Sequence, residues 1–136
     1  MTNLRPVRVV LDTNVLLSAC LKPSGLEARV VEMALSGEVE ACVTDAVWAE
    51  YEEVLRREKF CAFQIRAEEI LAGIGSCAVR VIAEETITAA SDEDDNRFLE
   101  CALAAGASFL ITGNLRHYPP EWRGTQMVNA RAFIQR

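Results

Sequence analysis

The chain has 136 residues, of which 51% are hydrophobic and 25% are charged, and its formal net charge is −6 at pH 7. This length and composition indicate a single compact domain over residues 1–136 and exclude a disordered chain. The acidic balance speaks against a protein that binds nucleic acid regardless of sequence, because phosphate contacts need Lys and Arg, but it agrees with an enzyme whose carboxylates hold cations.

The N-terminal residues lack a signal-peptide pattern, and the longest apolar runs fall short of a membrane span, so we expect a cytoplasmic protein with no membrane segment. The five cysteines have no metal-ligand spacing, which favours reduced and buried thiols. A mean hydropathy of +0.11 is consistent with apolar surface that a partner or a second copy covers.

Short β-rich runs alternate with helical patterns along the chain. In chain order, the expected elements are a strand at 8–11, helices at 14–21 and 26–35, a strand at 41–44, helices at 45–57 and 67–72, a strand at 79–82, a helix from the acidic cluster at 92–95 to 105, strands at 108–112 and 126–128, and a helical turn after 129. Strands separated by helices predict a three-layer α/β/α sandwich around a mostly parallel sheet of about five strands.

Several polar residues fall where the expected strands end, which is where open parallel sheets bind their ligands. Asp12 follows the first strand, Thr44 ends the second, and Thr112 ends the fourth. One interpretation of Asp12 is a simple cap on the helix that begins near Asn14. The other is a carboxylate that a central strand aims at a metal ion.

The helix expected at 45–57 carries acids beside its apolar stripe. Glu53 points almost opposite to the stripe, whereas Glu50 and Glu52 flank it on its two sides, so either could face a cleft. Periodicity does not choose between them. Any one of these acids could instead lie on a solvent-exposed face of the helix and pair with a basic residue four positions away.

Four consecutive acids at 92–95 precede the apolar helix that ends at 105. In helical register from Asp94 onward, Asp95 shares the face of Phe98 and Leu99, whereas Asp94 turns toward the edge. Acids suit the first turn of a helix, but capping does not explain a carboxylate on the buried stripe. Asp95 is therefore the member of the cluster that most needs a functional reason.

Carboxylates from three segments that meet at one sheet edge would repel one another, and a divalent cation removes that repulsion. Mg²⁺ and Mn²⁺ favour oxygen ligands and keep several waters, which leaves room for phosphate oxygens. The chemistry that this arrangement predicts is phosphodiester hydrolysis by a metal-activated water.

Four segments together resemble the PIN-domain family, and within it the VapC-like ribonucleases that are toxins of bacterial toxin–antitoxin pairs. They are VVLDTN at 9–14, TDAVWAEYEEVL at 44–55, DEDDNRFL at 92–99 and FLITGN at 109–114. They occur in order and at family spacing over about residues 8–133. The resemblance implies a metal-dependent endoribonuclease that cuts RNA, forms a homodimer and is neutralised by a cognate antitoxin protein.

The same resemblance implies that Asp12, Glu50 and Asp95 bind Mg²⁺ or Mn²⁺, so it selects Glu50 where periodicity does not choose. It places Thr112 beside the metal, as a hydroxyl that orients water or phosphate. Two further residues would give polar support nearby, namely Asn14 and Thr44.

Many PIN domains carry a further acid at the position where this chain has Asn114. The amide oxygen of Asn114 can still coordinate a metal, but it adds no charge, and Asp92 is the expected substitute. One-metal and two-metal catalysis both stay open. The neutral residue also keeps a second function open, a PIN-like scaffold with impaired catalysis that binds protein or RNA.

His117 is the only histidine of the chain. It is either a surface loop residue or, together with Arg116 and Arg123, a contact for RNA phosphate. Aspartyl-phosphate chemistry is a third and weaker functional hypothesis. It also needs an Asp after the first strand, but it usually needs a second Asp close by, where this chain has Asn14.

Overall fold

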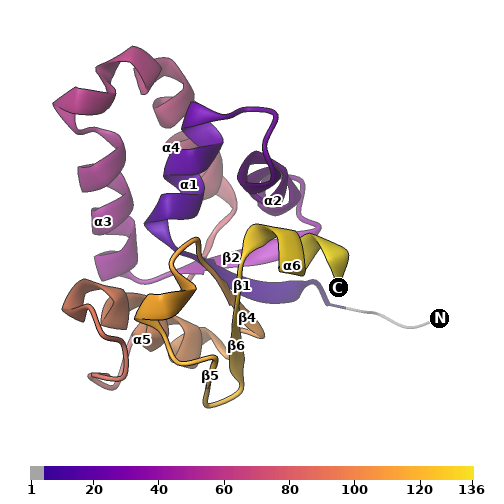
Figure 1. The fold of residues 1–136 in the computed structure, drawn as a ribbon, viewed down its shortest axis with the longest axis vertical. Coiled ribbons are helices and arrows are strands. Elements are labelled where there is room, and N and C mark those ends of the chain that lie inside the picture. Colours follow the sequence, from indigo (N-terminus) through magenta and orange to yellow (C-terminus); the bar gives the residue numbers. More distant parts are fainter. Residues whose placement is uncertain (1–4) are drawn as a thin grey trace.

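The computed structural model describes residues 5–136, which form a six-stranded sheet flanked by helices (Figure 1). The strand order is β3-β2-β1-β4-β6-β5. The strands are β1 (Val7–Leu11), β2 (Val39–Val43), β3 (Val79–Arg80), β4 (Phe109–Ile111), β5 (Glu121–Trp122) and β6 (Thr125–Val128). Neighbouring strands run parallel except β5 and β6, which are antiparallel.

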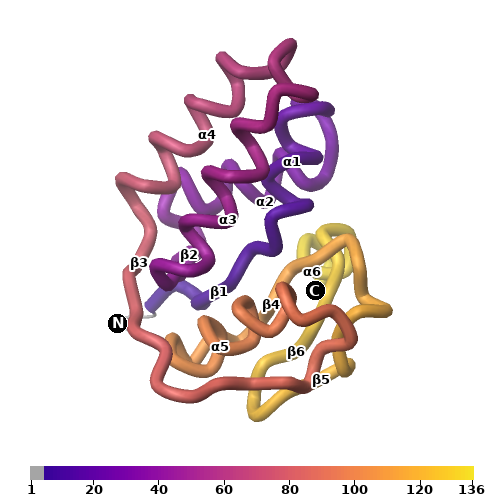
Figure 2. Tube along the Cα trace, turned by 90° about the vertical axis from the view of Figure 1, so that its left-hand side faces the viewer, coloured from indigo at the N-terminus to yellow at the C-terminus, as the bar shows by residue number. Residues whose placement is uncertain are grey.

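The helices lie on both faces of this sheet. They are α1 (Thr13–Leu21), α2 (Leu26–Leu35), α3 (Asp45–Leu55), α4 (Gln64–Cys77), α5 (Asn96–Ala105) and α6 (Ala130–Gln135), with 3₁₀ turns η1 (Glu58–Phe63), η2 (Glu93–Asp95) and η3 (Leu115–His117). Figure 2 shows α1 to α4 gathered on one side and α5 on the other. The expected α/β sandwich with a mostly parallel sheet is confirmed.

The two central strands, β1 and β4, are buried on both faces. Val9, Val10, Leu110 and Ile111 have no exposed surface, which explains why these segments are continuous apolar runs rather than alternating ones. The hydroxyl of Tyr51 on α3 donates to the last carbonyl of β1, at Leu11. The carboxyl end of β1 is therefore bonded to the buried side of α3.

Several expected elements differ from the observed ones at their boundaries, and for two of them the structure shows the physical reason. The strand expected at 79–82 stops at Arg80, because only the amide of Val81 still bonds to β2 and the chain then leaves the sheet. The helix expected at 67–72 extends over 64–77. Its glycines weaken the helical pattern, but they permit close packing, since a Cβ at Gly73 would lie 2.7 Å from the Leu35 side chain.

The sheet has six strands rather than about five, because a two-residue strand, β5, pairs with β6. The turn between them is formed by Arg123 and Gly124, with φ of 49° and 97°. Positive φ at both central residues is typical of a tight hairpin turn. So short a strand gives no periodic pattern in the sequence.

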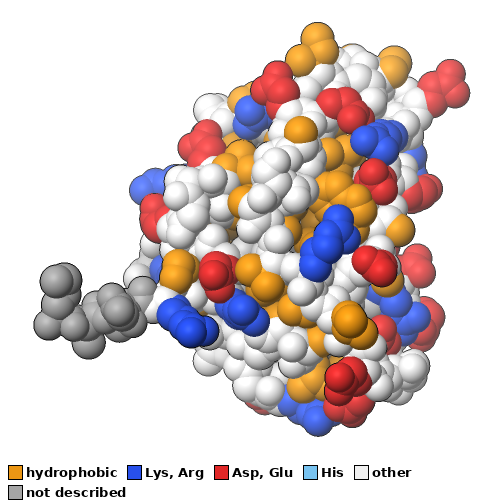
Figure 3. Space-filling model, turned by 180° about the vertical axis from the view of Figure 1, so that it is seen from behind, with side chains coloured by type: hydrophobic (Ala, Val, Ile, Leu, Met, Phe, Trp, Pro, Cys, Tyr) orange, Lys and Arg blue, Asp and Glu red, His pale blue; other side chains and the backbone are white. Residues whose placement is uncertain are grey.

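The surface mixes apolar and charged side chains. Among the described residues, the large apolar side chains that are exposed are Leu21, Leu35, Phe63, Ile65, Ile82 and Leu115. The face in Figure 3 shows apolar groups between acidic and basic ones, so this side is not a uniformly basic surface. Within residues 5–136, no helix has the length and apolar character needed to cross a bilayer.

Candidate active site

Asp12 and Thr112 stand side by side at the carboxyl ends of the central strands. Leu11 pairs with Ile111, and the Asp12 amide donates to the Ile111 carbonyl at 2.9 Å. Thr112 Oγ1 donates to Asp12 Oδ2 at 2.8 Å, with both residues buried. Strands β2 and β3 lie on one side of β1, and β4, which comes later in the chain, lies on the other side. The pair therefore marks the topological switch point, where open sheets bind ligands.

Asp12 occupies the N-cap position of α1, where the Thr13 and Asn14 amides lower the pKa of its carboxyl, and its carboxylate accepts hydrogen bonds across the sheet edge. Its second partner is the buried Tyr118, whose hydroxyl donates to the same oxygen, Oδ2, at 3.1 Å. These two donors fix the position of the carboxylate at the sheet edge. Tyr118 is a site residue that sequence reasoning missed, since it lies 106 positions from Asp12 and no motif marks it.

Replacing Tyr118 by Phe is expected to weaken cation binding about tenfold, as loss of a group that orients a metal ligand commonly does. The Asp12 carboxylate would lose one of its two anchors, and its pKa would rise further. Calorimetric titration with Mn²⁺ measures the change. The matched control is Tyr51→Phe, which also removes a buried hydroxyl but one bonded to a carbonyl. Equal affinities in the two variants would contradict a positioning role for Tyr118.

Helix α3 brings Glu50 to this edge. The Thr13 hydroxyl, in the first turn of α1, donates to Glu50 Oε2. Glu52 instead pairs with Arg56 at the surface, at 3.0 Å. The structure thus places Glu50 in the environment of Asp12, whose charge acts on it, and Glu52 at the surface.

Burial raises the pKa of Asp12 and of Glu50. For Asp12, desolvation is the largest cause, and the hydroxyls of Thr112 and Tyr118 oppose it. For Glu50, desolvation is again the largest cause, the Thr13 hydroxyl opposes it, and nearby acidic charges add to the rise. These carboxylates are costly to ionise in the absence of a positive charge.

Asp95 ends the η2 turn with its side chain only 13% exposed. Desolvation raises its pKa, and the charge of Asp12 adds to the rise. Asp95 Oδ2 lies 2.8 Å from Nδ1 of His117, which opposes the rise. His117 therefore faces the acids rather than bulk solvent alone.

Asp92 lies beside the same pair. One ligand atom each of Asp92, Asp95 and His117 falls within 4.8 Å of the others. Asp92 also caps η2 by accepting the Asp94 amide at 3.0 Å. The structure thus groups Asp92 with Asp95 and His117, while Asp12 shares hydrogen bonds with Thr112 and Tyr118.

The two asparagines hold the turn that follows β4. Asn14 Nδ2 donates to Thr112 Oγ1 at 3.5 Å, and Asn14 Oδ1 accepts the Gly113 amide at 2.9 Å. The backbone amide of Asn114 donates to Thr112 Oγ1 at 2.9 Å. Thr112 therefore has two donors and one acceptor around it, and its hydroxyl hydrogen is directed to Asp12.

Thr44 is not brought into contact with the acids. Its buried hydroxyl accepts the Val47 amide at 3.1 Å and so caps α3. We expect Thr44→Ala to lower the free energy of unfolding by about 1 kcal/mol, the usual loss for an N-cap. Thr44→Ser should retain it, and chemical denaturation compares the two. A Thr44→Ala protein with weaker cation binding and unchanged stability would instead place Thr44 in the site.

Two hollows flank the turn after β4. One, of about 300 Å³, is lined by Asn14, Val15, Ser18, Glu27, Thr112, Gly113, Asn114, Asn129 and Ala130. The other, of about 480 Å³, is lined by Gly113, Asn114, Leu115, Arg116, His117 and Asn129. Their amides and the Arg116 guanidinium are suitable donors to phosphate oxygens. Arg123 is not part of this group, because it pairs with Glu85 at 3.0 Å.

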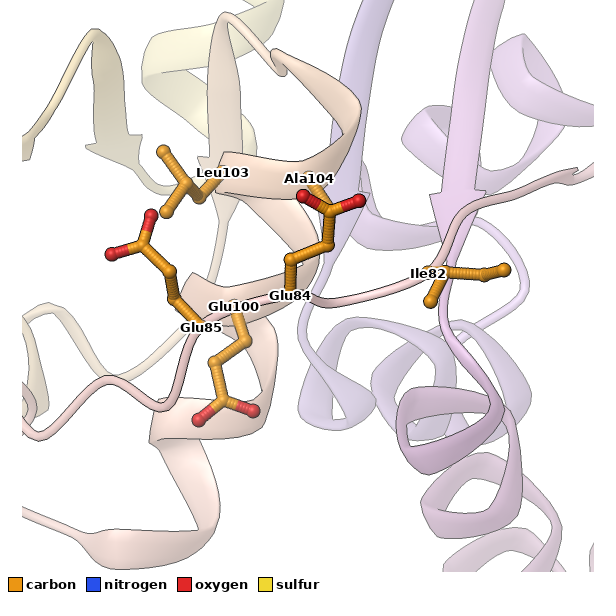
Figure 4. Close-up of a pocket in the computed structure, with 6 residues that line it drawn as sticks. All are labelled: Ile82, Glu84, Glu85, Glu100, Leu103 and Ala104. Carbon is orange, nitrogen blue, oxygen red and sulfur yellow. The ribbon is translucent and has the colours of Figure 1, made fainter.

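A third hollow, of about 280 Å³, lies beside α5 (Figure 4). Three glutamates line it, but Figure 4 shows their carboxylates pointing in different directions. Glu100 accepts the Ile87 amide at 3.0 Å and pairs with Arg97 at 2.8 Å. Glu85 pairs with Arg123 at 3.0 Å. Glu85 and Glu100 thus have structural partners, and the three acids do not form one ligand set.

Comparisons with known proteins agree with this fold. Residues 8–116 match the family described as PIN domain. The chain is 25% identical over 111 residues to an uncharacterized protein of Methanocaldococcus jannaschii. The aligned region covers 79% of this chain and 71% of that protein. The chain superposes on a chain of VapBC2 from Rickettsia felis with a TM-score of 0.60 and 15% identity, over 90% of this chain and 98% of the other. That structure contains VapBC2 bound to a DNA fragment from its promoter.

Proposed function

This chain belongs to the PIN-domain family, and we propose that it is a metal-dependent endoribonuclease, the toxin of a toxin–antitoxin pair. The observation that carries the proposal is the meeting of acids from three segments at the switch point of the sheet. Asp12 comes from the end of β1, Glu50 from α3 and Asp95 from the turn before α5. The pKa of each is raised, chiefly by burial.

Asp12, Glu50 and Asp95 fit a divalent cation, because they offer oxygen donors in a place where their negative charges are otherwise unfavourable. Mg²⁺ or Mn²⁺ would supply a nucleophilic water and stabilise charge on the phosphate. Thr112 and Tyr118 hold the Asp12 carboxylate through Oδ2, and Asp12 would be one of the residues that hold the ion. Asp92 and Asn114 are further ligands in the proposal for a second ion.

The amide and basic groups around the turn after β4 would receive the RNA backbone. Asn14 and Asn114 lie beside Thr112, and Arg116 and His117 line the neighbouring hollow. Phosphate contacts from such groups position a strand without reading its sequence. In the proposed site, the acids would hold the ion, and the amide and basic groups around the turn after β4 would hold the RNA.

The proposal extends to the partners. We propose that residues 1–136 form one domain of a cytoplasmic protein that assembles as a homodimer and is neutralised by a cognate antitoxin. The support is the family membership, the fold shared with VapBC2 from Rickettsia felis, and the exposed apolar side chains such as Ile65 and Ile82, which are more than 80% exposed.

RNA cleavage with and without Mg²⁺ or Mn²⁺ tests the function directly. We expect cleavage of single-stranded RNA only with the cation present, and restoration of activity after chelation and re-addition of Mn²⁺. Cleavage that persists in excess chelator would contradict the metal mechanism. Retained RNA binding without cleavage would favour the alternative of a PIN-like scaffold with impaired catalysis, for which the neutral Asn114 is the supporting observation.

A further inference from the structure

The loop that carries His117 is fixed against the acidic turn by the main chain. The Ser91 amide donates to the His117 carbonyl at 2.8 Å, and the Ser91 hydroxyl does so at 3.3 Å. These bonds bring the segment before α5 next to the segment after β4, although 26 residues separate the two positions. The His117 imidazole is thereby held over Asp95 and Asp92.

The distance between the His117 and Asp95 ligand atoms matches that of adjacent ligands on one ion. His117 Nδ1 and Asp95 Oδ2 are 2.8 Å apart. With bonds of about 2.1 Å at right angles, adjacent ligand atoms of an octahedral ion are about 3 Å apart. The Asp92 ligand atom lies within 4.8 Å of both. A small adjustment would therefore let one cation replace the proton that now joins His117 and Asp95.

We propose that His117 supplies a nitrogen ligand to the second ion, beside the carboxylates of Asp92 and Asp95, and that this ion shares Asp95 with the site of Asp12 and Glu50. The inference rests on the proposed function for that first site. In the loaded state, Nδ1 of His117 gives its lone pair to the ion and the imidazole proton sits on Nε2.

The ligand atoms of this site also determine which metal ions it prefers. Imidazole nitrogen suits transition-metal ions, whereas Mg²⁺ prefers oxygen ligands alone. The site of Asp12 and Glu50 offers only oxygens and has no such preference. The second site would therefore take a first-row transition-metal ion such as Mn²⁺ ahead of Mg²⁺, and His117 would be the residue that makes the difference.

Because His117 is the only histidine, any imidazole nitrogen coupled to a bound ion in the full chain without an added histidine tag identifies this residue. Pulsed electron paramagnetic resonance of the Mn²⁺-loaded protein detects such ¹⁴N coupling directly. We expect the coupling in the wild type, its persistence with equimolar Mg²⁺, and its loss in His117→Gln. Asp92→Asn should weaken Mn²⁺ binding at this site about tenfold.

The matched control is Glu84→Gln, which neutralises an exposed acid elsewhere and should leave the coupling unchanged. A circular dichroism spectrum and melting curve establish that each variant is folded. A wild type that cleaves RNA yet shows no ¹⁴N coupling at saturating Mn²⁺ would overturn the second site alone. Coupling in a wild type that cleaves no RNA would support the second site and overturn the proposed ribonuclease activity.

Discussion

Replacing Asp12 by Asn is expected to lower metal-dependent RNA cleavage by about 10³-fold or more. The variant keeps the shape of the side chain and its place at the end of β1, but it removes the most buried negative charge of the cation site. A metal ion contributes several kcal/mol to the stabilisation of such a transition state, and about 1.4 kcal/mol corresponds to tenfold in rate. Single-turnover cleavage of a labelled RNA at saturating Mn²⁺ measures the loss.

Asp45→Asn is the matched control, because Asp45 lies at the start of α3 with a fully exposed side chain. It should cleave at the rate of the wild type. The Asp12→Asn protein should unfold at the same temperature as the metal-free wild type or at a higher one, since the variant no longer buries a charge. Full activity of Asp12→Asn would remove Asp12 from the mechanism.

The second large effect is expected in the pH dependence of stability. The pKa values of Asp12, Glu50 and Asp95 are raised above their ordinary values of 3.8, 4.5 and 3.8. A carboxyl with a raised pKa in the folded state contributes stability that is present below its ordinary pKa and lost as the pH rises through the raised one. The metal-free protein should therefore lose stability from about pH 4 upward.

A divalent cation should reverse this loss, because it binds the ionised carboxylates of the folded state only. At a cation concentration of 100 times the dissociation constant, the gain is about 2.7 kcal/mol, which corresponds to a rise of about 5–10 °C in melting temperature for a domain of this size. The rise should be larger at pH 8 than at pH 5, where protons compete with the ion.

Melting curves with and without Mn²⁺ at both pH values measure the two effects together. Asp12→Asn combined with Glu50→Gln should flatten the pH dependence and abolish most of the shift caused by Mn²⁺. Glu52→Gln is the control, since Glu52 lies on the same helix but pairs with Arg56 at the surface. An equal response of the double variant and the control would contradict the assignment.

The sequence predicts those parts of the site that regular elements position. Asp12 follows a buried strand, so its place at the sheet edge follows from the apolar run before it and the parallel topology. Periodicity narrows the acids of α3 to Glu50 and Glu52 but cannot go further, because the two flank one stripe symmetrically. The contact that separates them, from Thr13, depends on how α1 packs against α3.

The remainder of the site comes from an irregular loop, where periodicity carries no information. His117 and Tyr118 contact Asp95 and Asp12 across 22 and 106 positions of sequence. Neither the backbone path of residues 113–120 nor the side-chain directions follow from residue type. Thr44 shows the converse case, in which a polar residue at a strand end caps the helix that follows it.

The pairing of β1 with β4 has a consequence for biosynthesis. The two hydroxyl donors to Asp12 lie 100 and 106 residues further along the chain. A nascent chain that has emerged only as far as α5 lacks β4, Thr112 and Tyr118, and its Asp12 carboxylate has no hydroxyl partners. Contacts of such long sequence separation are also slow to form, because closing a long loop costs entropy before the contact stabilises the fold. The edge that carries Asp12 is thus completed only after residues 109–118 have been synthesised.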